Sequence, residues 1–238
     1  MALFPILLPI LAAILAYALF SQPRPELAPI RTDAQVRNPL IKTVFFFVPL
    51  YALRLLFEFY NDFSYDPGGL YGLYFVQDYF GLFLILTFMS LYFNRRIRAT
   101  DPREAFVPHL IVFTTTLSLL GACDAVFGDS YWTLYELFFR PISYAIALLV
   151  LPFAIAMIVT DRGRLRALGY VIAFPVLFPF IAMWADWLRP GLAALTLGAI
   201  VLACAAFLFG EVRLFRPAAR YRRAREPQND AAPSFSEE

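Results

Sequence analysis

Charge is scarce in this 238-residue chain, and so are the residues that build most soluble catalytic centres. Only 16% of the residues are charged, whereas 61% are hydrophobic. A soluble domain usually has about 25% charged residues, so a water-soluble core cannot bury this much apolar surface and most of it must face lipid. Disordered, collagen-like and disulfide-framework proteins are excluded by the same composition. A net charge of +2 also argues against nucleic-acid binding as the main role.

Potential metal and cofactor ligands are equally few. The single histidine is His109, and the two cysteines, Cys123 and Cys204, both lie inside apolar stretches. These residues provide neither paired histidines for haem, nor a histidine-based zinc site, nor a disulfide framework. The only lysine, Lys42, lies far from the last apolar stretch, which excludes retinal attachment of the microbial rhodopsin type. No glycine-rich phosphate-binding loop is present, so we predict no cofactor, no metal and no ATP-driven motor.

Long apolar stretches are what the chain has in abundance. A helix needs roughly 20 mostly apolar residues to cross a bilayer. Seven stretches satisfy this requirement: 2–20, 42–60, 70–93, 106–126, 131–159, 167–187 and 190–210. The sequence therefore predicts an all-α integral membrane protein, with a bundle of seven transmembrane helices in residues 1–210. Residues 21–41 are predicted to form a cytoplasmic loop, and residues 211–238 a basic and then disordered cytoplasmic tail.

The distribution of basic residues predicts the orientation, because arginine and lysine concentrate on the cytoplasmic side of membrane proteins. Most of them lie at alternate connections and in the tail: Arg24, Arg31, Arg37, Lys42, Arg95, Arg96, Arg98, Arg103, Arg162, Arg164, Arg166, Arg213, Arg216, Arg220, Arg222, Arg223 and Arg225. We therefore expect the N-terminus outside and the C-terminus in the cytoplasm. The first span lacks a basic segment before it, which favours a retained helix over a cleaved signal peptide. The bacterial cytoplasmic (inner) membrane is the expected location.

Ionisable residues inside the predicted spans are the main indication of a site. Arg54 and Glu58 are four residues apart on the second span, as are Glu136 and Arg140 on the fifth, so each pair shares a helix face. Asp78 lies about 12 Å inside the third span. Because charges at this depth avoid lipid, we expect an outward-facing charged pocket between the second, third and fifth spans. Its candidate ligand- or ion-binding residues are Arg54, Glu58, Asp78, Glu136, Arg140, Tyr51, Tyr74 and Tyr144.

The same charges also fit a purely structural role, in which ion pairs lock helices together. Three functions therefore stay open: a non-transporting sensor or accessory subunit of a membrane complex, a carrier or channel-like protein for a small polar or cationic solute, and an intramembrane lipid-modifying enzyme. A non-enzymatic role is favoured, because the last of these would have only carboxylates and tyrosines as a nucleophile–base set.

Expected partners are the lipid bilayer itself and anionic lipid at the Arg-rich tail. A partner helix or a second copy of the chain is also expected to pack against the seventh span. That span carries small residues at helical spacing: Ala194, Gly198, Ala199, Ala203 and Ala206.

Overall fold

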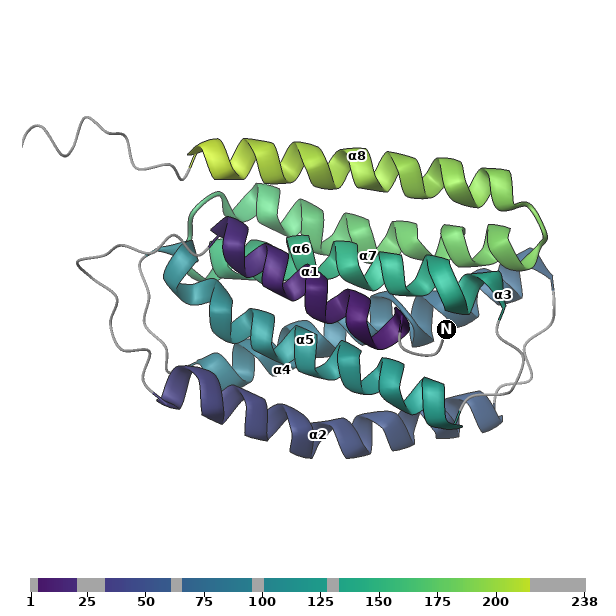
Figure 1. Ribbon diagram of the computed structural model, residues 1–238, viewed down its shortest axis with the longest axis horizontal. Helices are drawn as coiled ribbons and strands as arrows, with labels where there is room; N and C mark the ends of the chain where they lie inside the picture. Colours follow the sequence, from purple (N-terminus) through teal and green to yellow (C-terminus); the bar gives the residue numbers. More distant parts are fainter. Residues whose placement is uncertain (1–3, 21–32, 61–65, 96–100, 128–132, 215–238) are drawn as a thin grey trace, which may run out of the picture.

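The computed structural model describes residues 4–20, 33–60, 66–95, 101–127 and 133–214. The described part is all-helical (Figure 1). In chain order the helices are α1 (Phe4–Phe20), α2 (Asp33–Tyr60), α3 (Pro67–Gln77), α4 (Phe80–Asn94), α5 (Pro102–Phe127), the π-helix η1 (Tyr135–Phe139), α6 (Arg140–Val159), α7 (Arg164–Asp186) and α8 (Pro190–Leu214).

Six helical stretches are long and apolar enough to cross a membrane: Val36–Phe59, Pro67–Asn94, Ala105–Phe127, Tyr135–Val159, Arg164–Asp186 and Pro190–Gly210. These stretches correspond to the second to seventh predicted spans, and they confirm the prediction of a multi-pass helical membrane architecture. The remaining predicted span corresponds to α1, whose apolar stretch, Ile6–Phe20, is shorter than the other six.

The predicted loop over residues 21–41 is wrong in its second half, because α2 begins at Asp33. Residues 21–41 contain four prolines and mixed charge, which favours a loop, yet the last of these prolines, Pro39, lies inside α2. Proline is tolerated in membrane helices when neighbouring groups satisfy the carbonyl that it frees one turn earlier. Residues 21–32 lie outside the described residues. The tail from residue 215 onward does too, while its first residues, 211–214, continue α8.

Burial divides the helices into a centre and two edges. The membrane-crossing window of η1 and α6 is 78% buried, compared with 11% for α2 and 22% for α8. Helices α1, α5 and α7 all contact α6. Figure 1 shows α2 and α8 at opposite edges of the molecule. Aromatic rings fill the centre: the ring of Phe20 on α1 stacks on that of Phe153 on α6, with centroids 4.1 Å apart.

Two irregularities interrupt the regular α-helices, one inside a span and one at the start of another. The span Pro67–Asn94 breaks at Asp78 and Tyr79, between α3 and α4. The break brings the Val76 carbonyl oxygen against Gly81 so closely that a Cβ at Gly81 would clash with it. The second irregularity is η1, where the Arg140 backbone N–H donates to the Tyr135 carbonyl, five residues back. The α3–α4 break leaves backbone groups that require polar partners from other helices, and both irregularities adjoin the charged residues described next.

Candidate functional site

Four charged side chains from four different parts of the bundle meet at the α3–α4 break. We call Arg54 of α2, Asp78 of the break, Asp124 of α5 and Arg140 of α6 the charge quartet. Arg140 bridges the two carboxylates: its Nη2 lies 3.0 Å from Asp78 Oδ1, and its Nη1 lies 2.9 Å from Asp124 Oδ2. Both separations are hydrogen-bond distances, so Arg140 is the tightly bound cation of the group.

Arg54 contacts the same two carboxylates over longer distances. Its Nη2 is 3.3 Å from Asp78 Oδ1, and its Nη1 is 3.6 Å from Asp124 Oδ2. Its Nε lies 3.4 Å from Glu58 Oε1, one turn along α2. The buried Nη1 makes no hydrogen bond within the described residues. The quartet is therefore asymmetric, with a closely paired arginine on the central helix and a loosely paired one on an edge helix.

The quartet is largely removed from the surface, and its formal charges cancel. The side chains of Asp78, Arg140 and Arg54 are 6%, 9% and 12% exposed, and that of Asp124 is 25% exposed. Asp78 lies about 17 Å along the helix axis from Pro67 and about 24 Å from Asn94, well inside the span. A single charge at such depth costs roughly 2.5–3.5 kcal/mol on insertion scales, so mutual pairing is what makes the group tolerable.

Tyrosines complete the hydrogen bonding around Asp78. The Tyr135 hydroxyl donates to Asp78 Oδ2 at 3.0 Å, and a 3.0 Å hydrogen bond joins the hydroxyls of Tyr135 and Tyr79. The Tyr144 hydroxyl donates to the backbone carbonyl of Asp78 at 3.4 Å and accepts from Arg140 Nε at 3.1 Å. Tyr144 thus satisfies a carbonyl at the helix break while also orienting the arginine that holds the Asp78 side chain.

A second ring of polar contacts surrounds the quartet. The Tyr74 hydroxyl donates to Asp186 Oδ2 at the end of α7, and Gln77 Nε2 donates to Glu58 Oε1. The Tyr74 ring also packs against the Tyr135 ring, with centroids 4.8 Å apart. These contacts tie α3 to α2 and α7, so the polar network reaches most of the bundle.

The structure brings together four of the eight candidate residues named from the sequence: Arg54, Asp78, Arg140 and Tyr144. Glu58 lies next to the quartet, where it contacts Arg54, and its side chain is 43% exposed. Tyr74 is engaged with Asp186.

The other two candidates form no hydrogen bond or ion pair with the quartet among the contacts described. The Tyr51 ring stacks on that of Phe47 of its own helix, with centroids 5.7 Å apart. Glu136 does not pair with Arg140; its Oε2 accepts from the Thr133 backbone N–H at 3.1 Å. In return the Glu136 backbone N–H donates to the Thr133 hydroxyl at 3.2 Å, which forms a reciprocal cap. The π-helical turn changes the spacing between Glu136 and Arg140, and Arg140 has two aspartates closer at hand.

Sequence reasoning missed Asp124, Tyr79 and Tyr135. Asp124 lies three residues before the end of α5, so it looks like an interfacial acid. A charge balance does not single it out, because Glu58, Asp78 and Glu136 already offer more acids than the two intramembrane arginines need. Nothing distinguishes Tyr79 and Tyr135 from the other tyrosines of this aromatic-rich chain before the helix break and η1 are seen.

Comparisons with protein-family models, with curated proteins and with solved structures find no match. Within the described residues no group of three or more histidine, cysteine, aspartate or glutamate side chains is arranged to hold a metal ion. What the quartet can do chemically follows from its own contacts. It can hold four helical elements together through buried ion pairs, and it can offer the unsatisfied Nη1 of Arg54 to an acceptor atom.

Proposed function

We propose that this chain is a non-transporting membrane protein that serves as a sensor or an accessory subunit of a membrane complex. It would cross the bacterial cytoplasmic membrane seven times, with the N-terminus outside and the C-terminus in the cytoplasm. The observation that carries this proposal is the pairing of the quartet: each of its four charges contacts both oppositely charged members. A carrier needs charged groups that exchange a solute for a protein partner, whereas these charges already satisfy one another.

An exposed stripe of small residues on α8 supports an accessory role. Ala194, Gly198 and Ala199 lie on the exposed side of this edge helix, whereas Ala193 is fully buried toward the bundle. Small residues let helix backbones approach closely in membranes. Because the bundle leaves this stripe open, α8 offers a surface for a partner helix or a second copy of the chain.

The decisive experiment compares transport with association. In proteoliposomes, the purified protein should give no sodium, proton or solute flux above empty vesicles. In native membranes, Gly198→Cys should form an oxidative cross-link to a second copy or to a partner. The matched control is Val48→Cys on the other edge helix, because Val48 is 68% exposed and has no small-residue stripe around it. Measurable flux, or equal cross-linking of both variants, would refute the proposal.

The proposed orientation has its own test. A reporter fused after Glu238 or inserted near Arg98 should read cytoplasmic, while one inserted near Gly68 should read external. An external signal at Arg98 would exclude the seven-span topology. We also propose that the Arg-rich tail contacts anionic lipid, so removing its arginines should weaken control of the orientation.

A carrier for a small polar or cationic solute is the second candidate, and two observations favour it. Discontinuous helices near the bilayer midplane form the substrate sites of many transporters, and α3 and α4 are discontinuous at Asp78. The Nη1 group of Arg54, which makes no hydrogen bond within the described residues, would also be able to donate to an acceptor atom of a polar solute. Asp78→Asn separates the two candidates: a carrier variant would keep a folded bundle and show altered flux, whereas the non-transporting protein would show only reduced stability.

A further inference from the structure

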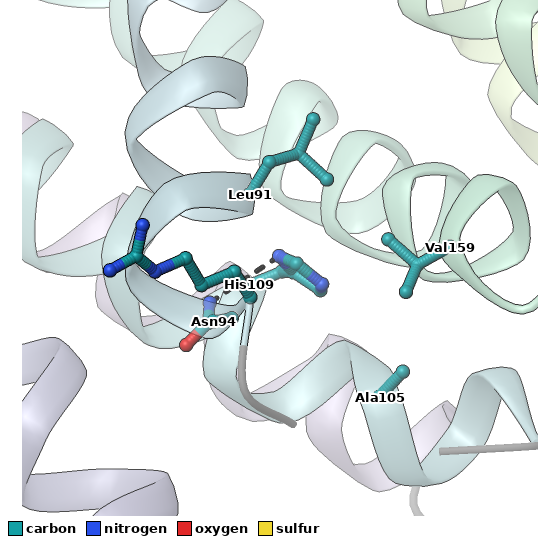
Figure 2. Close-up of a pocket in the computed structure, with 6 residues that line it drawn as sticks. Leu91, Asn94, Ala105, His109 and Val159 are labelled. Atoms are coloured by element: carbon teal, nitrogen blue, oxygen red, sulfur yellow. Dashed lines mark hydrogen bonds between the residues drawn. The ribbon is translucent and has the colours of Figure 1, made fainter. Parts of the chain in front are cut away.

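A cavity of about 140 Å³ lies at the opposite end of the bundle from the α3 N-terminus, where α4 ends, α5 begins and α6 ends. Figure 2 shows this cavity. We call it the His109 cavity, and its lining residues are Leu91, Asn94, Arg95, Ala105, His109 and Val159. In other proteins a cavity of about 150 Å³ accepts benzene, so this one has room for a six-membered ring.

His109 presents one polar atom to this space. Within the described residues its hydrogen-bond contacts are made by Nδ1, which lies 2.5 Å from the Ser90 hydroxyl oxygen and 3.5 Å from Asn94 Nδ2. An amide nitrogen can only donate, so Nδ1 accepts and the ring proton resides on Nε2. In Figure 2 this second ring nitrogen points away from Asn94, toward the side where Val159 lies. His109 is only 3% exposed, so the surrounding helices hold its N–H in place.

Apolar side chains surround the place that Nε2 faces. Figure 2 shows Leu91, Ala105 and Val159 around the space on that side of the ring. These side chains carry no hydrogen-bonding atom, so they offer the N–H no acceptor. Val159, the last residue of its span, is 43% exposed, so a molecule dissolved in the bilayer can reach the cavity past it.

The guanidinium of Arg95 lies over an aromatic ring at the surface. Its Cζ is 4.7 Å from the centroid of the Tyr92 ring, and both residues are exposed. A cation is stabilised over such a ring face. A charged ligand beside the apolar walls would lose its hydration without gaining a paired charge, so the cavity favours an uncharged molecule.

We propose that the His109 cavity binds the ring of an uncharged quinone dissolved in the bilayer. One ring carbonyl accepts a hydrogen bond from His109 Nε2–H, and the ring packs between Leu91, Ala105 and Val159. The second carbonyl lies at the opposite edge of the ring, toward the exposed Val159, where water can reach it. A carbonyl suits this site better than a hydroxyl, because a hydroxyl brings a proton that the apolar walls leave without an acceptor. Binding here is independent of solute transport and of association through α8.

The experiment uses the full chain, with ¹⁵N-labelled histidine, in nanodiscs of ether-linked phosphatidylcholine, which has no ester carbonyl to compete. His109 is the single histidine of the chain, so with an affinity tag that lacks histidine the nuclear magnetic resonance spectrum contains one imidazole. The probe is duroquinone, whose fully methylated ring resists addition to thiols. The comparison is durene, a ring with the same methyl groups and no oxygen, at equal concentration in the bilayer.

We expect the free protein to carry its ring proton on Nε2, and duroquinone to shift the Nε2–H signal until the site is saturated. Durene accepts no hydrogen bond and should bind about ten-fold more weakly. Val159→Phe places a larger side chain in the cavity and should weaken duroquinone binding about ten-fold. Its matched control is Val44→Phe on α2, because Val44 is 47% exposed and does not line the cavity. This control should bind like the wild type.

His109→Phe should bind duroquinone and durene equally, because it removes the donor. An Nε2–H signal that duroquinone leaves unchanged would overturn the proposal, and so would equal binding of duroquinone and durene by the wild type. Unchanged duroquinone binding by Val159→Phe would overturn it too, since this exposed position can change without loss of the fold.

Discussion

The charge quartet and the contact between His109 and Asn94, at the other end of the bundle, show two ways in which this apolar bundle treats buried polar groups. In the quartet each cation meets two anions from other helical elements, and tyrosine hydroxyls complete the hydrogen bonding of Asp78. At the other end Asn94 Nδ2 lies 3.5 Å from His109 Nδ1, and Asn94 Oδ1 has no hydrogen-bond partner in the described part of the chain. The difference teaches that the bundle pairs its charged groups between helices but leaves a neutral amide partly unsatisfied, so we expect the charged groups to contribute far more to stability.

The largest expected effect comes from breaking the quartet at its tightest member. Arg140→Met leaves Asp78 and Asp124 without their closest cation, and should lower the free energy of unfolding by about 3–5 kcal/mol. The double variant Arg140→Met/Asp78→Leu keeps Arg54 and Asp124 as a neutral pair, so it should recover much of the loss. Reversible unfolding in bicelles measures both. A double variant no more stable than the single one would contradict the role of the quartet as a lock.

A methyl group at the helix break should have the next largest effect. Gly81→Ala places a Cβ against the Val76 carbonyl oxygen and should cost about 1–3 kcal/mol, because the break that positions Asp78 has to shift. Gly72→Ala is the matched control, since nothing lies within 4 Å of a Cβ there. Thermal unfolding of the two variants should separate them clearly, and equal stability would show that the break is not held at this close approach.

Two acids near the same end of the bundle allow a comparison between a member of the charge quartet, Asp124, and an acid outside it, Glu136. Asp124→Asn removes a partly exposed charge that pairs with both arginines and should cost about 1–3 kcal/mol. Glu136→Gln changes only a capping side chain that can still accept from Thr133, and should cost less than about 1 kcal/mol. A larger loss for Glu136→Gln in the same melting experiment would mean that the cap, not Asp124, organises this region.

The smallest effect is expected at Asn94. Asn94→Leu should change the free energy of unfolding by no more than about 0.5 kcal/mol, since the hydrogen bond lost to His109 is long and an unsatisfied oxygen is removed with it. Reversible unfolding of the variant checks this. A loss comparable to that of Asp124→Asn would show that Asn94 is a structural residue.

The membrane class of this protein is predictable from the sequence because hydropathy is a local property. Arg54, Asp78 and Arg140 also attract notice locally, as charges within apolar stretches. Which of these charges pair with one another cannot be predicted in the same way, because pairing depends on how the helices pack. Glu136 and Arg140 have the spacing of a pair on a regular helix, yet the π-helical turn and the nearer aspartates separate them. Pro39 illustrates the same limit. Its presence favours a loop by the rules of soluble proteins, yet a membrane helix such as α2 tolerates proline.

The order of the quartet along the chain has a consequence for biogenesis. Its members appear as Arg54, Asp78, Asp124 and Arg140, on consecutive spans. The first two spans of this set therefore carry one cation and one anion, and the next two carry one of each again. If the spans enter the lipid one after another, the summed charge of the quartet is +1, 0, −1 and 0 in turn, so it never departs from neutrality by more than one elementary charge during synthesis.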